Sequence, residues 1–98
     1  MLFEIETPLG FRVRVTRPRW ELISDAKHPA MLGKELSVKT ALEKPDEIRQ
    51  SRRDSKVFLF YRVERPGRWT CAVAREDGFL ITAYPTDAIK EGVKVWPR

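Results

Sequence analysis

The sequence predicts an α+β fold of order β-β-α-α-β-β-β, in which two helices pack on one face of an antiparallel sheet. Residues 56–84 are rich in β-branched and aromatic side chains and are interrupted at Pro66-Gly67 and Asp77-Gly78, two turn sequences that predict a three-stranded meander. Two earlier segments, 18–27 and 32–42, carry apolar side chains at spacings of three and four, which favours amphipathic helices. Separate runs of helices and strands are typical of the α+β class.

A hairpin is predicted ahead of the first helix. In residues 1–16, apolar and charged side chains alternate on both sides of the turn Thr7-Pro-Leu-Gly10, which predicts two paired strands with one face toward the core. Cross-strand charge pairs, each worth a few tenths of a kcal/mol to ~1, are then expected between Glu4 or Glu6 and Arg12 or Arg14. We expect a single domain over residues 1–98, with 1–16 as an added hairpin and 17–92 as the core.

Prolines bound the two predicted helices. The first helix is expected from Pro18 to Lys27 and stops at His28-Pro29, because the residue before a proline disfavours helical backbone angles. The second helix is predicted to end at Pro45, with an apolar stripe formed by Leu32, Leu36, Val38, Ala41 and Leu42. Residues 47–54 are expected to form a polar connector that Ile48 anchors in the core.

The C-terminal quarter of the chain predicts the end of the meander and one edge strand. The third meander strand is expected over 79–84 and ends at Pro85, which has no backbone N–H for a ladder. Residues 86–91 predict one or two helical turns, with Thr86 as cap and Gly92 as stop. Alternation over 93–98 predicts a last, short edge strand.

The charge of the chain suggests a polyanionic partner. Its net charge is +5, and arginines concentrate in residues 11–20 and 49–56. Arginine favours phosphate recognition because its guanidinium can grip two oxygens, although a solvated basic face without a partner explains the charge equally well. No apolar run approaches the ~20 residues that span a bilayer, and acids stand where a secretory signal carries bases, so we expect no membrane partner and a cytoplasmic location. Cys71 is the only cysteine and is expected to be a small buried residue.

Several classes of chemistry find no support in the sequence. It has no Gly-rich phosphate loop, no spacing of His, Cys or acidic residues typical of a metal site, and no base beside Cys71, so we expect no cofactor and no metal. General acid–base chemistry assisted by arginine remains. Metal-free RNA cleavage needs only a base for the 2′-hydroxyl, an acid for the leaving oxygen and a cation for the phosphate.

The candidate catalytic residues are His28, Thr82 and Tyr84. His28 has the one side chain that ordinarily titrates near neutral pH, and it lies at a helix end, where it can face a cleft or simply cap the turn. Thr82 and Tyr84 are two apart on a strand, so they share a face, and Leu80 is expected below them on that face. Strand propensity alone would also place them there.

The candidate substrate-binding residues are Arg49, Ser51 and Arg62. Arg49 and Ser51 belong to the polar segment before the meander, where a solvated linker is as good an interpretation as a functional role. Arg62 follows Tyr61 on the first meander strand, and neighbouring strand residues face opposite ways, so only one of the two can look into a cleft.

A family resemblance covers roughly residues 20–90. The pattern that carries it is Trp20-x-x-Ile23-x-x-x-x-His28-Pro29, then Val38-x-x-x-Leu42-x-x-Pro45-Asp46-x-Ile48-x-x-Ser51-x-x-Asp54, then Tyr61-Arg62, and finally Gly78-Phe-Leu-Ile-Thr82-Ala83-Tyr84. It resembles the phage-associated branch of the barnase/EndoU/colicin/RelE-like nuclease superfamily. The resemblance implies two helices followed by a small antiparallel sheet, and metal-independent RNA cleavage by a toxin or phage effector. It also implies that His28 is the general acid or base, that Arg49 and Arg62 hold phosphate, and that Thr82 and Tyr84 orient or protonate at the scissile phosphate.

Three functions are therefore considered. The first is a small ribonuclease, with RNA as partner and substrate. The second is a nucleic-acid-binding module that uses the same basic face without catalysis. The third is an interaction domain whose basic loop meets an acidic protein such as an antitoxin or a regulator.

Overall fold

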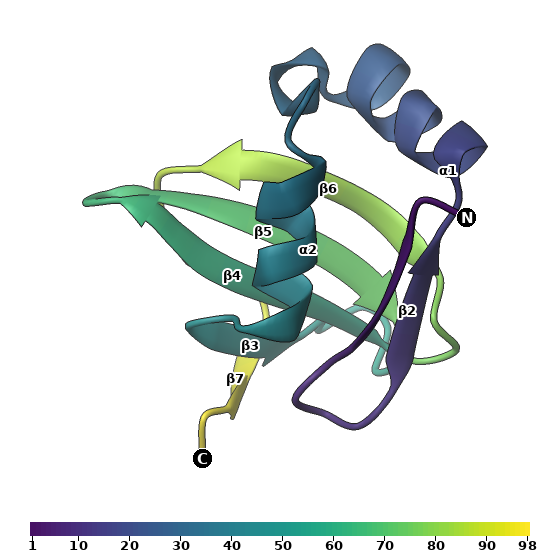
Figure 1. Ribbon diagram of the computed structural model, residues 1–98. Coiled ribbons are helices and arrows are strands. Elements are labelled where there is room, and N and C mark those ends of the chain that lie inside the picture. Colours follow the sequence, from purple (N-terminus) through teal and green to yellow (C-terminus); the bar gives the residue numbers. More distant parts are fainter.

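The computed structural model describes residues 1–98 and has the α+β architecture that the sequence predicts (Figure 1). A two-stranded hairpin and a five-stranded antiparallel sheet are joined through a helical region. The strands are β1 (Phe3–Glu6), β2 (Arg12–Val15), β3 (Glu47–Gln50), β4 (Val57–Arg65), β5 (Arg68–Arg75), β6 (Leu80–Thr86) and β7 (Val93–Trp96). The helical segments are α1 (Arg17–Glu21), the π-helical η1 (Leu22–Lys27), the 3-10 turn η2 (Pro29–Met31) and α2 (Glu35–Glu43).

The five-stranded sheet has the order β6-β5-β4-β3-β7, with the predicted meander forming β4, β5 and β6. β4 is the central strand, which accounts for its apolar side chains on both faces. The prediction of a polar connector over 47–54 was wrong in its first half, because β3 pairs with β4 on one side and β7 on the other. Ile48 is fully buried, as expected, and the connector is confined to residues 51–56.

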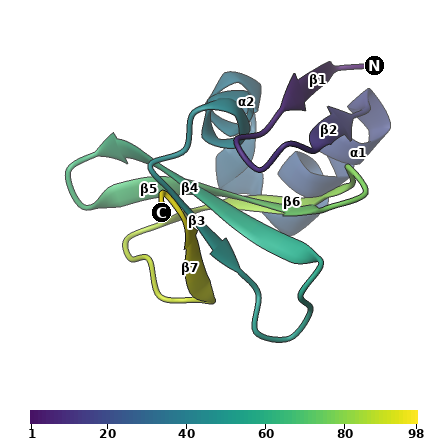
Figure 2. The same cartoon turned by 90° about the horizontal axis from the view of Figure 1, so that it is seen from below.

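The main core lies between the sheet and the helices. α2 crosses one face of the sheet, and α1 with η1 packs beside the edge strand β6 (Figure 2). Phe60, Ala72 and Ala83 occupy one row across β4, β5 and β6 and face this layer. The prediction that both helices cover one face of an antiparallel sheet is confirmed.

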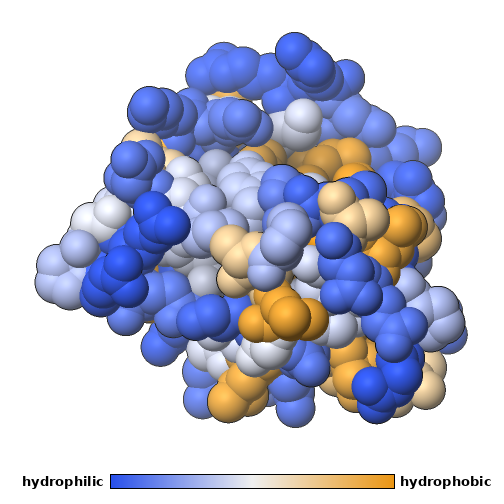
Figure 3. Space-filling model, turned by 90° about the horizontal axis from the view of Figure 1, so that it is seen from above, coloured by the Kyte–Doolittle hydropathy of each residue, from blue (hydrophilic) through white to orange (hydrophobic).

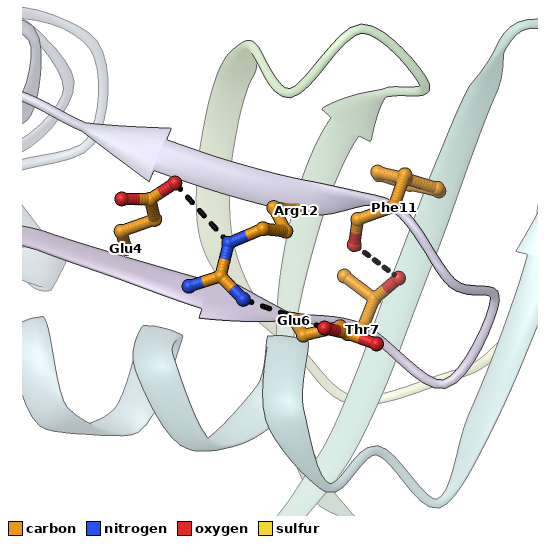
Figure 4. Close-up of polar contacts among 5 residues, drawn as sticks. All are labelled: Glu4, Glu6, Thr7, Phe11 and Arg12. Atoms are coloured by element: carbon orange, nitrogen blue, oxygen red, sulfur yellow. Dashed lines mark hydrogen bonds and ion pairs between the residues drawn. The ribbon is translucent and has the colours of Figure 1, made fainter.

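The N-terminal hairpin belongs to the same core. Ile5, Val13 and Val15 are buried in it, and β2 meets the start of β6 through a hydrogen bond from the Arg14 N–H to the Gly78 carbonyl at 3.0 Å. On the outer face, Arg12 alone forms ion pairs with both acids of β1, at 3.2 and 3.3 Å (Figure 4). Arg14 has no carboxylate partner, so only part of the predicted charge pairing is present.

Pro-containing sequences set the helical boundaries as predicted, with one difference. Helical backbone runs continuously from Arg17 to Lys27 and ends at His28, one residue before Pro29. α2 begins only at Glu35, so Leu32 lies outside it and is 68% exposed, and Leu36 lies in its first turn but on the solvent side, where it is 74% exposed. The buried stripe of α2 consists of Val38, Ala41 and Leu42.

Two further predictions for the C-terminal part were wrong. Residues 86–91 form no helix, because the Thr86 hydroxyl closes a local turn with Ala88 instead of capping a helix, and Ile89 packs against the sheet. Leu80 does not lie on the face of Thr82: the pairing of β5 with β6 shifts register between Thr82 and Leu80, and this bulge sends Leu80 into the helix-covered core. The predicted edge strand is present as β7.

Viewed from the α1 side, apolar side chains form small separate groups among hydrophilic ones (Figure 3). None of the helices combines the length and the apolar character that a passage across a lipid bilayer requires.

Candidate functional site

The candidate site lies on the face of the sheet opposite α2, which we call the open face. Tyr61, Cys71 and Tyr84 form one row across β4, β5 and β6, and Leu59, Val73 and Thr82 form the next row. Side chains alternate along each strand, so both rows project away from the main core and form a second, smaller cluster. Ile89, in the connection between β6 and β7, packs on this cluster and turns the face into a groove.

A cavity of about 380 Å³, which we call the aromatic cavity, occupies the middle of this groove. Its floor and walls combine apolar and aromatic side chains from the sheet with polar side chains from the two connections beside it. The lining residues are Ser51, Val57, Leu59, Tyr61, Val73, Thr82, Tyr84, Thr86, Asp87, Ala88, Lys90 and Glu91. The cavity therefore offers an apolar surface with several hydroxyls and two carboxylates at its edge.

A second cavity of about 410 Å³, which we call the cationic cavity, adjoins the first and shares Ser51, Leu59, Lys90 and Glu91 with it. Arg52, Arg53 and Gly92 complete its lining. Neither arginine, nor Lys90, forms an ion pair with a carboxylate. Three cations facing one acid leave this cavity with an excess of positive charge that attracts phosphate.

The backbone fixes the arginines of the cationic cavity. The connection from β3 to β4 is closed by a hydrogen bond from the Ser51 N–H to the Val57 carbonyl at 2.9 Å. Within it, the Ser51 hydroxyl accepts from the Arg53 N–H at 3.2 Å, and the Asp54 carboxylate accepts from the Lys56 N–H at 2.9 Å. These short-range bonds hold the loop in a defined turn and set the positions from which Arg52 and Arg53 extend.

Thr82 carries an unsatisfied polar group. Its Oγ1 atom is buried and has no hydrogen-bond partner, and the residue is part of the wall of the aromatic cavity. A buried hydroxyl without a partner costs about 1–3 kcal/mol of desolvation. A ligand that offers a donor or acceptor at this point would recover that free energy.

The hydroxyl and thiol groups of the open face remain protonated at neutral pH. Burial raises the pKa of the Cys71 thiol to about 12. Burial, followed by the influence of neighbouring Cys71, also raises the pKa of Tyr61 and of Tyr84 well above their usual range. These tyrosines can donate hydrogen bonds to a ligand, but they cannot act as bases near neutral pH.

His28 lies beside the groove and contacts one of its walls. Its backbone N–H donates to the Ile23 carbonyl at 2.8 Å, which fixes the residue at the end of η1. Its ring centroid is 5.6 Å from that of Tyr84, and the two rings are tilted by 50°. Tyr84 thus touches His28 and lines the aromatic cavity, whereas His28 lines neither cavity.

The other predicted residues divide between the groove and the rest of the molecule. Ser51 lines both cavities. Arg49 projects at the margin of the groove, where it pairs with Glu47 at 2.6 Å and donates to the carbonyl of Gly92 at 3.3 Å. Arg62 donates to the Lys44 carbonyl just after α2, on the opposite face, so the structure separates it from Thr82 and Tyr84.

Sequence reasoning assigned no site role to several residues that line the groove. Asp87, Lys90 and Glu91 were expected on a short surface helix, and no motif distinguishes them from other charged residues of the chain. Arg52 and Arg53 do stand out in the sequence as part of the arginine-rich stretch 49–56, which is the signal that could have identified them.

No group of three His, Cys, Asp or Glu side chains lies close enough together to hold a metal ion. Comparisons of the chain with protein-family models, with curated proteins and with solved structures find no match. The geometry of the open face is therefore the basis for the function argued below.

Proposed function

We propose that this chain is a small ribonuclease that binds RNA along the open face and cleaves it without a metal ion. The observation that carries the proposal is the contact between His28 and Tyr84 at one side of a groove whose other side holds three unpaired cations. An imidazole, neutral hydroxyls and cations are the groups that this reaction requires. Since RNA is the proposed substrate, we place the activity in the cytoplasm.

The groups have separate roles in the proposed reaction. His28 exchanges a proton with the 2′-hydroxyl or the leaving oxygen. Tyr84 remains neutral and donates a hydrogen bond to the phosphate or the sugar next to it, and Thr82, on the same face, orients the neighbouring nucleotide. Arg52, Arg53 and Lys90 hold phosphate through charge and hydrogen bonds.

The width of the sheet supports a proposal in which the groove binds more than one phosphate of the RNA. Arg52 and Arg53 follow β3, three strands along from β6, and neighbouring strands are about 4.8 Å apart. One phosphate cannot contact both these arginines and His28 across roughly 10 Å or more. We therefore propose that the scissile phosphate lies beside His28 and the Tyr84 hydroxyl, outside the aromatic cavity, and that another phosphate of the same strand occupies the cationic cavity.

The test is cleavage of single-stranded RNA in the presence of EDTA. The expected products end in a 2′,3′-cyclic phosphate, and His28→Ala is expected to lower the rate by at least ~100-fold, the typical contribution of a general acid or base. Arg17→Ala serves as the control, because Arg17 is exposed and forms no hydrogen bond or ion pair in the structure. Absence of cleavage by the unchanged protein, or full activity of His28→Ala with intact folding, would overturn the proposal.

One observation favours a second candidate, an RNA-binding module without catalysis. The ring of Tyr84 lines the aromatic cavity, whereas His28 does not. If His28 never reaches the bound strand, the same groove binds RNA and leaves it intact. Salt-sensitive RNA binding without any product after long incubation identifies this candidate.

A further inference from the structure

The two cavities of the open face differ in the chemistry of their linings. The cationic cavity has Arg52, Arg53 and Lys90 against Glu91. The aromatic cavity has Lys90 against Asp87 and Glu91, so its charge balance is reversed, and half of its lining residues are apolar or aromatic. A phosphate is favoured in the first cavity and disfavoured in the second.

The aromatic cavity has the properties of a site for a flat, polar aromatic group. Its volume of about 380 Å³ lies within the ~300–1,000 Å³ typical of small-molecule sites. Tyr61 and Tyr84 offer aromatic surface, and Leu59 and Val73 form an apolar floor. Thr82, whose buried hydroxyl has no hydrogen-bond partner, adds an unused hydrogen-bonding group at the cavity wall.

We propose that the two cavities together bind one nucleotide, with the base in the aromatic cavity and its phosphate in the cationic cavity. The base carries an exocyclic amino group, because Asp87 and Glu91 are acceptors that pair with N–H donors. Thr82 contacts an edge of the base and gains the partner that it lacks. The identification of the nucleotide as part of an RNA strand rests on the proposed function; the binding of a single nucleotide does not.

The experiment is a calorimetric titration with the four nucleoside 3′-monophosphates and with inorganic phosphate, in EDTA. The three nucleotides with amino-bearing bases are expected to bind at least ~10-fold more tightly than the uridine nucleotide, since a hydrogen bond to a charged acceptor contributes about 1.5–3 kcal/mol. Inorganic phosphate is expected to bind most weakly, because it fills only the cationic cavity.

Two variants distinguish the contribution of the aromatic cavity from that of the cationic cavity. Thr82→Val keeps the shape of the side chain and is expected to weaken nucleotide binding about fivefold while leaving phosphate binding unchanged. The double substitution Arg52→Gln and Arg53→Gln is expected to weaken binding of both. Thr40→Val, at a half-buried position on α2 that is far from both cavities, is the control and should bind like the unchanged protein.

Nucleotides that bind no more tightly than phosphate, or unchanged nucleotide affinity in Thr82→Val, would overturn the nucleotide site. The outcome of this calorimetric titration is independent of the outcome of the ribonuclease assay. Tight mononucleotide binding together with intact RNA supports the nucleotide site and overturns the ribonuclease. RNA cleavage by a protein that binds no mononucleotide supports the ribonuclease and overturns this site.

Discussion

At the scale of single residues, burial decides the chemistry of the open face. Cys71 was expected to be a small buried residue, and it is fully buried between Tyr61 and Tyr84. The two tyrosines keep their protons for the same reason, since their charged forms would have to leave water. The alternation of side chains was enough to predict that Thr82 and Tyr84 share a face. The bulge that moves Leu80 to the other face depends on the pairing of β6 with β5, and no sequence pattern predicts it.

The buried thiol makes the stability of the protein depend on alkaline pH. Burial raises the pKa of Cys71 from 9.0 to about 12, so the unfolded chain releases this proton first as the pH rises. Its contribution is complete below about pH 9 and decreases by about 1.4 kcal/mol per pH unit between about pH 9 and pH 12. Urea unfolding at about pH 8 and about pH 10.5 should show a loss about 2 kcal/mol greater for the unchanged protein than for Cys71→Ala. Equal losses in the two proteins would mean that the folded thiol titrates normally.

The unpartnered hydroxyl of Thr82 gives a second prediction. Thr82→Val removes a buried group that forms no hydrogen bond, so the free energy of unfolding should stay the same or rise by up to about 1 kcal/mol. Urea unfolding of this variant, compared with Thr40→Val, measures the effect. A loss of stability confined to Thr82→Val would show that the hydroxyl has a partner within the protein.

At the scale of elements, strand pairing and tertiary packing determined structure that the sequence pattern alone did not predict. Residues 47–50 contain a single apolar side chain, Ile48, so no alternating pattern marks them as a strand. They form β3 because β4 and β7 offer backbone partners on both sides. Residues 86–91 contain residues that suit a helix end, yet the packing of the partly buried Ile89 against the sheet favours an irregular path. The long, strongly patterned elements were predicted well because local preference and tertiary packing agree in them.

Arg19 donates hydrogen bonds to backbone carbonyls of the edge strand β6. Arg19 of α1 donates from Nε to the Leu80 carbonyl at 2.9 Å and from a terminal nitrogen to the Ile81 carbonyl, and its guanidinium lies 4.4 Å from the ring centroid of Phe79. Arg19→Leu should therefore lower the free energy of unfolding by about 1–3 kcal/mol. Arg17→Leu, two positions earlier, should change it by less than about 0.5 kcal/mol. Equal effects in a urea series would show that the bonds to β6 contribute nothing.

At the scale of the whole molecule, the two faces of the five-stranded sheet have different surroundings. The helices and the hairpin bury one face, which forms the main core. The connections that carry Arg52, Arg53 and Lys90 lie beside the other face. The net charge suggested a polyanionic partner but could not locate its site. Ion pairs neutralise Arg12, Arg49 and Arg75, whereas Arg52, Arg53 and Lys90 pair with no carboxylate and line one cavity, which is why we propose that cavity as the site.

This distribution of charge predicts how RNA binding responds to salt. If Arg52, Arg53 and Lys90 together neutralise the phosphate in the cationic cavity, log K should fall with log salt concentration with a slope of about −0.7 for single-stranded RNA. The double substitution Arg52→Gln and Arg53→Gln removes two of the three cations and should make this slope clearly shallower. Fluorescence anisotropy with labelled RNA measures both, and Arg17→Gln is the control. An unchanged slope in the double variant would place the phosphates elsewhere on the surface.

The central claim is that the open face is where RNA binds, and an NMR titration tests it most directly. The ligand is an oligonucleotide with 2′-deoxy substitutions, which cannot be cleaved because it lacks the attacking hydroxyl. The account predicts that the largest chemical-shift changes occur in residues 51–53 and 86–92 and at Thr82, Tyr84 and His28, with little change in α2. Shifts centred on α2 or on the N-terminal hairpin, with the groove unaffected, would contradict it.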